Sequence, residues 1–196
     1  MTSTRSRTGA RPDAAGGTDA RFEVQVCSAA IDHKDVVRQL LELYLHDLSE
    51  FTDANVGSHG VYGYFYLDDY WTEPDRHPFL LQVDNHWAGL ALVRSGSPHD
   101  MSEFFVMRKY RRNGVGRAAV QILFDSFPGD WQIRQLAANR PATRFWRSVI
   151  PVPFEEDNIE MGPRQRFRVG ELVGSPRPKT AAQACITRTD RSGIRH

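Results

Sequence analysis

Alternating and helically spaced apolar residues divide the chain into short elements. Residues 22–26 alternate apolar and polar side chains, which predicts a β-strand. From residue 36 to 48 apolar side chains recur three and four positions apart, which predicts an amphipathic helix with Asp32 as a candidate N-cap. Residues 49–60 are polar and contain glycine, so a loop or a short second helix is expected there.

The middle of the chain predicts a hairpin followed by a buried strand. Two apolar stretches, 79–83 and 87–93, flank the turn dipeptide Asp84-Asn85, which is typical of a β-hairpin. Residues 101–107 then predict a buried strand. The segment just before the hairpin, residues 62–71, is rich in aromatic side chains and holds two aspartates.

Helical and alternating patterns interleave in the second half. A helix is expected from Val115 until Pro128-Gly129 ends it, and residues 131–136 alternate as a strand. Asn139 is a candidate N-cap of a further helix, because Pro141 is tolerated in a first helical turn.

Two short strands near Ile159 and Phe167 complete the expected sheet. This order predicts an α/β fold, a mixed and mostly antiparallel sheet flanked by helices. Residues 21–173 are expected to form one domain. The ends, residues 1–20 and 174–196, are rich in small, polar and basic residues, which predicts flexible tails.

Charge and hydropathy exclude some classes of partner. The 196-residue chain has a formal net charge of +1 at pH 7, so nothing general favours nucleic acid or an anionic membrane, although arginines gather in both tails. The first residues hold no apolar stretch like a signal peptide, and no apolar run reaches membrane-spanning length. A cytoplasmic protein is expected.

The two cysteines indicate a reducing compartment. Cys27 falls in an expected strand and Cys185 in the expected C-terminal tail, and two such residues make no disulfide framework. Neither has the spacing of a metal ligand, and the scattered histidines form no metal constellation. No metal site is expected.

The segment 101–117 carries the sharpest chemical signal. It reads as a strand, a basic loop with two glycines and then a helix. Backbone amides at a helix start lack intrahelical partners and favour anions, and glycine lets a phosphate approach them closely. The sequence matches neither the Gly-x-x-x-x-Gly-Lys-Ser/Thr phosphate loop nor the Gly-x-Gly-x-x-Gly dinucleotide fingerprint.

Three motifs in order resemble the GNAT superfamily of N-acetyltransferases. The family's acyl-CoA signature Arg/Gln-x-x-Gly-x-Gly/Ala is matched by residues 111–116, Arg-Arg-Asn-Gly-Val-Gly. Asn139-x-x-Ala142-x-x-Phe145-Trp146 is similar to its second CoA motif, and residues 88–93 are similar to its third strand. The resemblance covers about residues 22–169.

The resemblance implies that acetyl-CoA is the co-substrate and that a small-molecule amine attacks it directly. It implies a pantetheine contact at Val106 and a diphosphate site in the loop. The cofactor-binding residues expected on this basis are Val106, Arg111, Arg112, Asn113, Gly114, Val115, Gly116, Arg117 and Asn139. In such a fold the fourth and fifth strands separate and leave a slot for the thioester. Dimers are common in the family, so a homodimer is one expectation.

A general base must deprotonate the amine before it attacks. Glu103 on the fourth strand is the first candidate and Asp100 at its start is the second. A structural carboxylate paired with an arginine is the alternative for Glu103. Many relatives use a tyrosine of the fourth helix to protonate the thiolate, but no tyrosine follows Tyr110 here. Water or another group would then do this work.

The acceptor side is expected in the aromatic segment. Asp68 and Asp69 are candidate ligands of a cationic amine, with Tyr70 and Trp71 packing against it. The alternative is that these aromatic residues belong to the core and the aspartates are exposed at a turn. Two other functions stay open: a GNAT-fold transferase that uses another acyl donor such as aminoacyl-tRNA, and a non-catalytic acyl-CoA-binding module.

Overall fold

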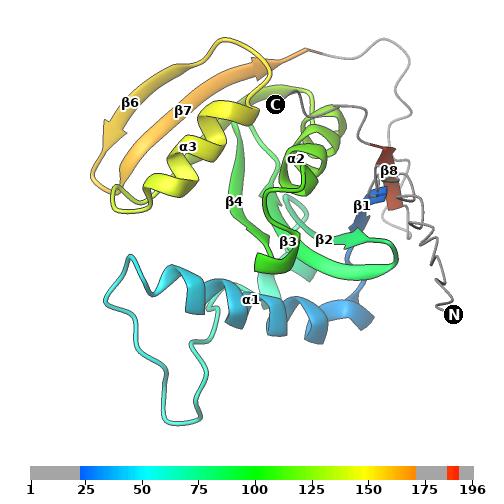
Figure 1. Cartoon of the computed structure of the whole chain (residues 1–196), viewed down its shortest axis with the longest axis vertical. Coiled ribbons are helices and arrows are strands. Elements are labelled where there is room, and N and C mark those ends of the chain that lie inside the picture. The colour runs from blue at the N-terminus through cyan, green and yellow to red at the C-terminus, as the bar shows by residue number, and fades with distance from the viewer. Residues whose placement is uncertain (1–22, 171–184, 190–196) are drawn as a thin grey trace, which may run out of the picture.

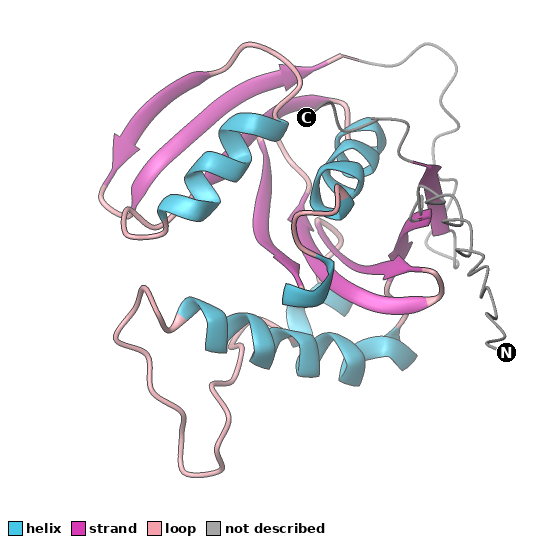
Figure 2. Cartoon of the chain, in the orientation of Figure 1, coloured by secondary structure: helices cyan, strands magenta, loops and turns pink. Residues whose placement is uncertain are grey.

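The computed structural model describes residues 23–170 and 185–189. Within these ranges the chain forms one eight-stranded sheet, in the order β6-β7-β5-β4-β3-β2-β1-β8, with helices on both faces (Figures 1 and 2). Neighbouring strands run antiparallel except for β4 and β5, which are parallel. The predicted fold class, a mixed and mostly antiparallel sheet flanked by helices, is confirmed.

The strands and helices follow closely the order that the hydropathy pattern predicts. The strands are β1 (Glu23–Ser28), β2 (Arg76–Val83), β3 (His86–Arg94), β4 (His99–Val106), β5 (Gly129–Arg134), β6 (Glu155–Ile159), β7 (Gly162–Val169) and β8 (Cys185–Thr189). The α-helices are α1 (Lys34–Leu48), α2 (Val115–Ser126) and α3 (Arg140–Val149). Short 3-10 turns are η1 (Ile31–His33), η2 (Asp68–Trp71) and η3 (Arg108–Tyr110).

Local signals explain the turn between β2 and β3 and the start of α3, but not the start of α1. Asp84 and Asn85 have φ angles of 48° and 62°, the left-handed conformation of a type I′ hairpin turn. The Asn139 side chain accepts from the Ala142 amide at 3.1 Å and caps α3, as predicted. Asp32 is not the N-cap of α1, because η1 precedes this helix and α1 begins only at Lys34. Residues 49–60 form a loop without a helix.

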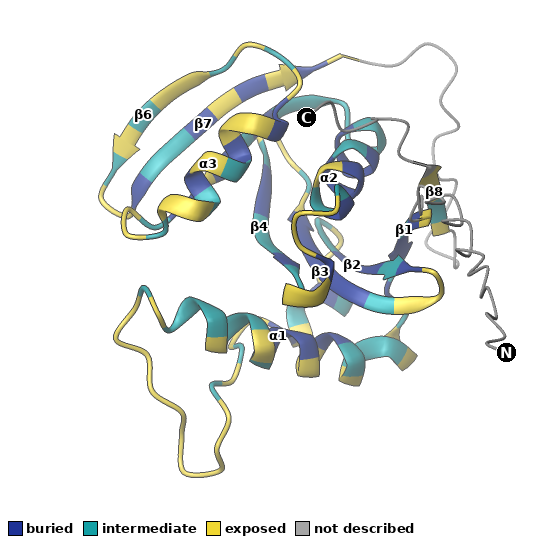
Figure 3. Cartoon of the chain, viewed as in Figure 1, coloured by how far each residue is buried: buried dark blue, intermediate teal, exposed yellow. Residues whose placement is uncertain are grey.

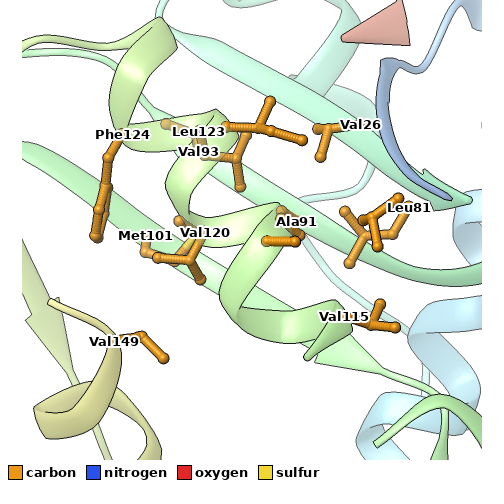
Figure 4. Packing of buried hydrophobic residues seen from close by; sticks show 14 of the residues in the cluster. Val26, Leu81, Ala91, Val93, Met101, Val115, Val120, Leu123, Phe124 and Val149 are labelled. Atoms are coloured by element: carbon orange, nitrogen blue, oxygen red, sulfur yellow. The ribbon is translucent and has the colours of Figure 1, made fainter. Parts of the chain in front are cut away.

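The sheet buries apolar side chains on both faces. Alternating residues of β2, β3 and β4 point to α1 on one face, and their neighbours point to α2 and α3 on the other. The α1 face gathers Val37, Leu40, Leu41, Leu80, Leu90, Leu92 and Phe105. The opposite face gathers Val26, Leu81, Ala91, Val93, Met101, Val120, Leu123 and Phe124 (Figure 4). Figure 3 shows these faces as mostly buried and the loop after α1 as exposed.

The expected C-terminal tail contains a strand. β8 pairs with β1 in a register that places Cys185 opposite Cys27, and the two cysteines form a disulfide. The expectations of a tail over residues 185–189 and of no disulfide are therefore wrong. The disulfide joins cysteines that lie 158 positions apart in the sequence. The spacing of the two cysteines could not indicate that they meet in the fold. Residues 1–20, 174–184 and 190–196 of the predicted tails lie outside the described residues, and the domain limits 21–173 stay a prediction.

Candidate active site

The loop before α2 presents free backbone amides. Gly114 is the N-cap of α2 with a φ of 77°, and no side chain caps the helix. Its carbonyl accepts from the Ala118 amide at 3.0 Å. The amides of Val115, Gly116 and Arg117 therefore have no partner within the helix and lie at the positive end of its dipole. Such an arrangement can hold a diphosphate.

A cavity of about 600 Å³ opens beside this loop. Its walls come from the C-terminal half of α1 and the residues after it, the end of β4, the loop, the start of α2 and the length of α3. They include Tyr44, Asp47, Phe104, Val106, Arg111, Arg112, Gly114, Gly116, Arg117, Asn139 and Phe145. Of the predicted cofactor residues, all but Asn113 and Val115 line this cavity. The Val115 side chain is buried in the core, so only its amide can serve a ligand.

The close approach of α2 to α3 favours a glycine at position 116. A Cβ at Gly116 would lie 3.1 Å from the ring of Phe145 and 3.6 Å from Val106. A side chain there would push against the wall of the cavity. The second glycine of the motif therefore lets the helix start approach both the end of β4 and α3.

One arginine of the motif is already engaged. Arg111 donates from Nε to the Val106 carbonyl at 2.7 Å and pairs with Asp47 of α1, which also pairs with Arg108 at 2.7 Å. Burial acts to raise the pKa of Asp47, but the hydrogen bonds from Arg108 and Arg111 outweigh it and lower that pKa. Asp47 thus stays ionised and ties α1 to the loop. Arg112 and Arg117 are exposed on the cavity wall.

β4 and β5 separate beside the cavity. They pair only at His99–Trp131 and Asp100–Gln132, after which β5 continues along β7. A Cβ on Gly89 of β3 would meet the Phe105 carbonyl at 2.0 Å, so that carbonyl faces β3. Because successive residues of a strand direct their backbone groups to opposite sides, those of Phe104 and Val106 face the open side.

A bulge in β4 brings the two candidate bases onto one face. Leu92 pairs with Glu103 and Val93 with Met101, so Ser102 is the extra residue of β4. In a regular strand, positions 100 and 103 would point to opposite faces. The bulge turns Asp100 and Glu103 together toward α1.

Glu103 occupies an aromatic, half-buried site. Its Oε1 accepts from the Tyr64 hydroxyl at 3.0 Å. Burial raises the pKa of Glu103, and hydrogen bonds from the Tyr44 and Tyr64 hydroxyls oppose this rise without cancelling it. Glu42 of α1 holds the loop that carries Tyr64, by accepting from the amides of residues 62 and 63 at 2.7 and 2.9 Å. Glu103 is paired with tyrosines, whereas the alternative interpretation required an arginine partner.

Asp100 is the carboxylate that an arginine holds. Arg134 of β5 donates to its Oδ2 at 2.8 Å, and the Ser102 hydroxyl lies 3.3 Å from the same oxygen. Asp100 is 7% exposed, and its Oδ1 has no hydrogen-bond partner among the described residues. Neither Asp100 nor Glu103 lines the cavity directly.

The four predicted acceptor residues lie away from the cavity wall and have partners elsewhere. Asp68 pairs with Lys34 at 2.8 Å, and Asp69 pairs with Arg76 at 3.4 Å. Tyr70 is buried in the core on the α1 face. Trp71 donates from Nε1 to the Ala29 carbonyl at 2.9 Å. These contacts match the alternative interpretation of core aromatics with aspartates at a turn.

Sequence reasoning gave no site role to Tyr44, Asp47 or Tyr64. Tyr44 lies on the apolar face of the first helix, so its periodicity indicated a core position. The other apolar residues on that face of the helix are aliphatic. A lone tyrosine hydroxyl among them was the signal in the sequence that could have indicated a role in the site. Tyr64 reaches Glu103 across 39 positions of sequence, and no local pattern indicates that contact.

Within the described residues we find neither a metal-binding cluster nor a membrane-spanning helix. No group of three or more His, Cys, Asp or Glu side chains there could hold a metal ion. None of the helices in these ranges combines the length and the apolar composition that crossing a membrane requires.

Comparison with solved structures finds the same fold at low sequence identity. An acetyltransferase from Thermus thermophilus superposes with a TM-score of 0.58 and 13% identity, covering 73% of this chain and 94% of that one. Spermidine N-acetyltransferase from Vibrio cholerae, solved with CoA and spermine, gives 0.54 and 9%, covering 73% and 92%. Ribosomal-protein-S18-alanine N-acetyltransferase from Escherichia coli gives 0.51 and 14%, covering 76% and 96%.

Comparison with curated proteins gives no match. A family model does match: that of the Acetyltransferase (GNAT) family aligns with residues 38–149, more than half of the chain. The aligned region runs from α1 through the amide-lined loop to the end of α3, and so contains the cavity and both candidate bases. The chain belongs to the GNAT acetyltransferase family.

Proposed function

We propose that this protein transfers the acetyl group of acetyl-CoA to a primary amine of a small molecule. The observation that carries the proposal is the free amide row of residues 115–117, which opens onto a cavity bordered by the separated edge of β4. Solved relatives with the same fold include one with CoA and spermine bound.

The loop before α2 and the edge of β4 would bind different parts of acetyl-CoA. The amides after Gly114 would hold the diphosphate, and Arg112 and Arg117 would add positive charge beside it. Backbone groups of Phe104 and Val106 face the open side of β4, where they can bond an extended pantetheine arm. The Arg111 side chain already donates a hydrogen bond to the Val106 carbonyl oxygen. It would have to move if the pantetheine arm bonds to the same oxygen.

Glu103 would act as the general base. Its raised pKa brings the carboxylate nearer to the acidity of an ammonium ion, which favours proton transfer. The amine nitrogen then forms a bond with the acetyl carbon as the carbon–sulfur bond breaks. Strand amides at Phe104 and Val106 can donate to the acetyl oxygen, where negative charge develops.

Tyr44 would supply the proton for the departing thiolate. It is the tyrosine among the residues that line the cavity, and hydrogen bonding links its hydroxyl to Glu103. Burial first, and then the Glu103 charge, raise the pKa of Tyr44, so the hydroxyl stays protonated while Glu103 is ionised. When Glu103 has taken the proton of the amine, that charge is gone, and the hydroxyl becomes the stronger acid that protonation of the departing thiolate requires.

A thiol-release assay with acetyl-CoA across a panel of amines tests the proposal. The panel includes spermidine, an aminoglycoside and a peptide with a free N-terminus, and a mass gain of one acetyl group identifies the acceptor. We expect release with at least one small amine and none without an acceptor. CoA binding without any release would favour the non-catalytic module, and steep salt dependence with tRNA would favour an aminoacyl donor.

A further inference from the structure

The Arg111 side chain bridges two walls of the cavity. Its Nε donates to the Val106 carbonyl of β4 at 2.7 Å, and its Nη2 donates to Asp47 Oδ2 of α1. The guanidinium also lies 5.6 Å from the centroid of the Phe105 ring. All four residues line the cavity, so the bridge lies inside the space that a ligand would enter.

A second arginine holds the carboxylate end of this bridge. Arg108 donates to Asp47 Oδ1 from Nε at 3.0 Å and from Nη2 at 2.7 Å, which leaves Oδ2 for Arg111. Burial acts to raise the pKa of Asp47, but the hydrogen bonds from the two arginines keep that pKa below its usual value. Asp47 is therefore charged at neutral pH. Hydrogen bonds between charged groups are stronger than those between neutral ones, so the bridge is favoured in the free protein.

The bridge uses a backbone group that the coenzyme would need. The Phe105 carbonyl and the Met107 amide both face β3, so the backbone groups of Val106 between them point to the opposite side. On that side β5 has already left β4, because the two strands pair only at the start of β4. A pantetheine arm that extends along this edge would pass the Val106 carbonyl. The Arg111 guanidinium and such an arm therefore exclude each other.

We propose that Arg111 and Asp47 form a gate that coenzyme A must open before its pantetheine arm can lie along β4. The gate rests on the proposed use of acetyl-CoA and adds a role for α1 in coenzyme binding. When only a fraction of the free protein is open, the apparent affinity for the coenzyme falls by that fraction. The nucleotide half of CoA would bind the loop amides and does not compete with Arg111, so the two halves should respond differently to the gate.

Proton–nitrogen NMR of arginine Nε–H groups in the full-length protein observes the gate directly. The Arg111 signal is assigned by its loss in Arg111→Lys. In the free wild type this Nε–H should exchange slowly with water, because it is bonded to the Val106 carbonyl. CoA should make the exchange fast, whereas 3′-phospho-ADP, the coenzyme without its pantetheine arm, should leave it slow. In free Asp47→Asn the exchange should already be fast.

Stopped-flow binding measures what the gate does, followed by the fluorescence of Trp146 in the cavity wall. Asp47→Asn should raise the association rate constant and the affinity for CoA about fivefold or more, and should leave the affinity for 3′-phospho-ADP unchanged. Glu50→Gln is the matched control, since it removes the same charge from the cavity wall and Glu50 has no bond to Arg111. It should bind both probes like wild type.

A second variant guards against a folding defect in Asp47→Asn. Arg111→Lys keeps the positive charge and the pair between Asp47 and Arg108, but it loses the planar fork that bonds two groups at once. It should also speed CoA association.

The possible results separate the gate from the proposed function. Unchanged CoA association in both variants would overturn the gate, and so would equal acceleration with both probes or in Glu50→Gln. Fast exchange of the Arg111 Nε–H in the free wild type would overturn the gate alone. Wild-type protein that binds no CoA would contradict the proposed function and the gate together.

Discussion

Glu103 shows how the surroundings of one residue set its chemistry. A glutamate on an exposed strand would titrate in the ordinary acidic range and would be a weak base at neutral pH. Here burial raises its pKa, and two tyrosine hydroxyls keep the ionised form from becoming too costly. The carboxylate is therefore poised closer to the pH at which it would work.

The pH profile of Glu103→Gln tests this assignment. The base acts only when ionised, so wild-type kcat/KM should fall as pH drops through the raised pKa, above the usual range of glutamate. In Glu103→Gln, kcat should fall about 10²–10⁴-fold and this acidic limb should disappear. Calorimetry should give an unchanged affinity for CoA. A variant that turns over as fast as wild type would remove Glu103 from the mechanism.

At the level of elements, α1 and β4 together would form the acceptor half of the proposed site. The bulge in β4 turns Glu103 toward α1, and α1 contributes Tyr44 to the cavity wall and Glu42 to the loop that carries Tyr64. The other half comes from α2 and α3, which approach at Gly116. The edge of β4 that β5 leaves unpaired lies between the two halves.

Tyr44→Phe separates a proton donor from a packing residue. With acetyl-CoA, kcat should fall at least about tenfold, because the thiolate would leave unprotonated. With the selenoester analogue of acetyl-CoA the loss should be much smaller, because a selenolate is a weaker base. Tyr62→Phe, whose hydroxyl bonds Ser49 next to the same helix, is the matched control. An equal loss with both donors would assign Tyr44 to packing alone.

The sequence predicted what local patterns encode. Hydropathy spacing gave the strands and helices through residue 169, and the Gly114–Gly116 motif gave the amide-lined loop, because both depend on neighbours within a few positions. The Ser102 bulge, the Tyr64–Glu103 contact and the pairing of β8 with β1 were missed. Each depends on residues brought together by the whole sheet, which one sequence does not display.

At the scale of the molecule, the disulfide ties the C-terminal strand to the N-terminal one. Cys27 and Cys185 lie opposite each other in paired strands at one side of the sheet, and the bond closes a loop of 158 positions. A cross-link over such a long loop restricts the unfolded chain strongly. β8 thereby covers the edge of β1 that would otherwise stay unpaired.

Removing this bond should destabilise the fold without changing the site. Cys185→Ser should lower the free energy of unfolding by about 2–4 kcal/mol, measured by denaturant titration under oxidising conditions. Reductant should lower wild-type stability by a similar amount and leave Cys27→Ser/Cys185→Ser unchanged. Equal stability of all these proteins, or two free thiols in the oxidised wild type, would contradict the cross-link.

The binding of CoA to the loop before α2 is the claim on which the whole account depends, and calorimetric titration with CoA measures it directly. Wild-type protein should bind CoA at one site per chain, and Gly114→Ala should weaken binding at least about tenfold. Gly60→Ala is the matched control, because Gly60 and Gly114 have φ angles of 74° and 77° and so share the backbone strain of a substitution. Gly60 lies in the exposed loop after α1, so its variant should bind like wild type. No heat of binding in the wild type, or equal affinity in all three proteins, would contradict the account.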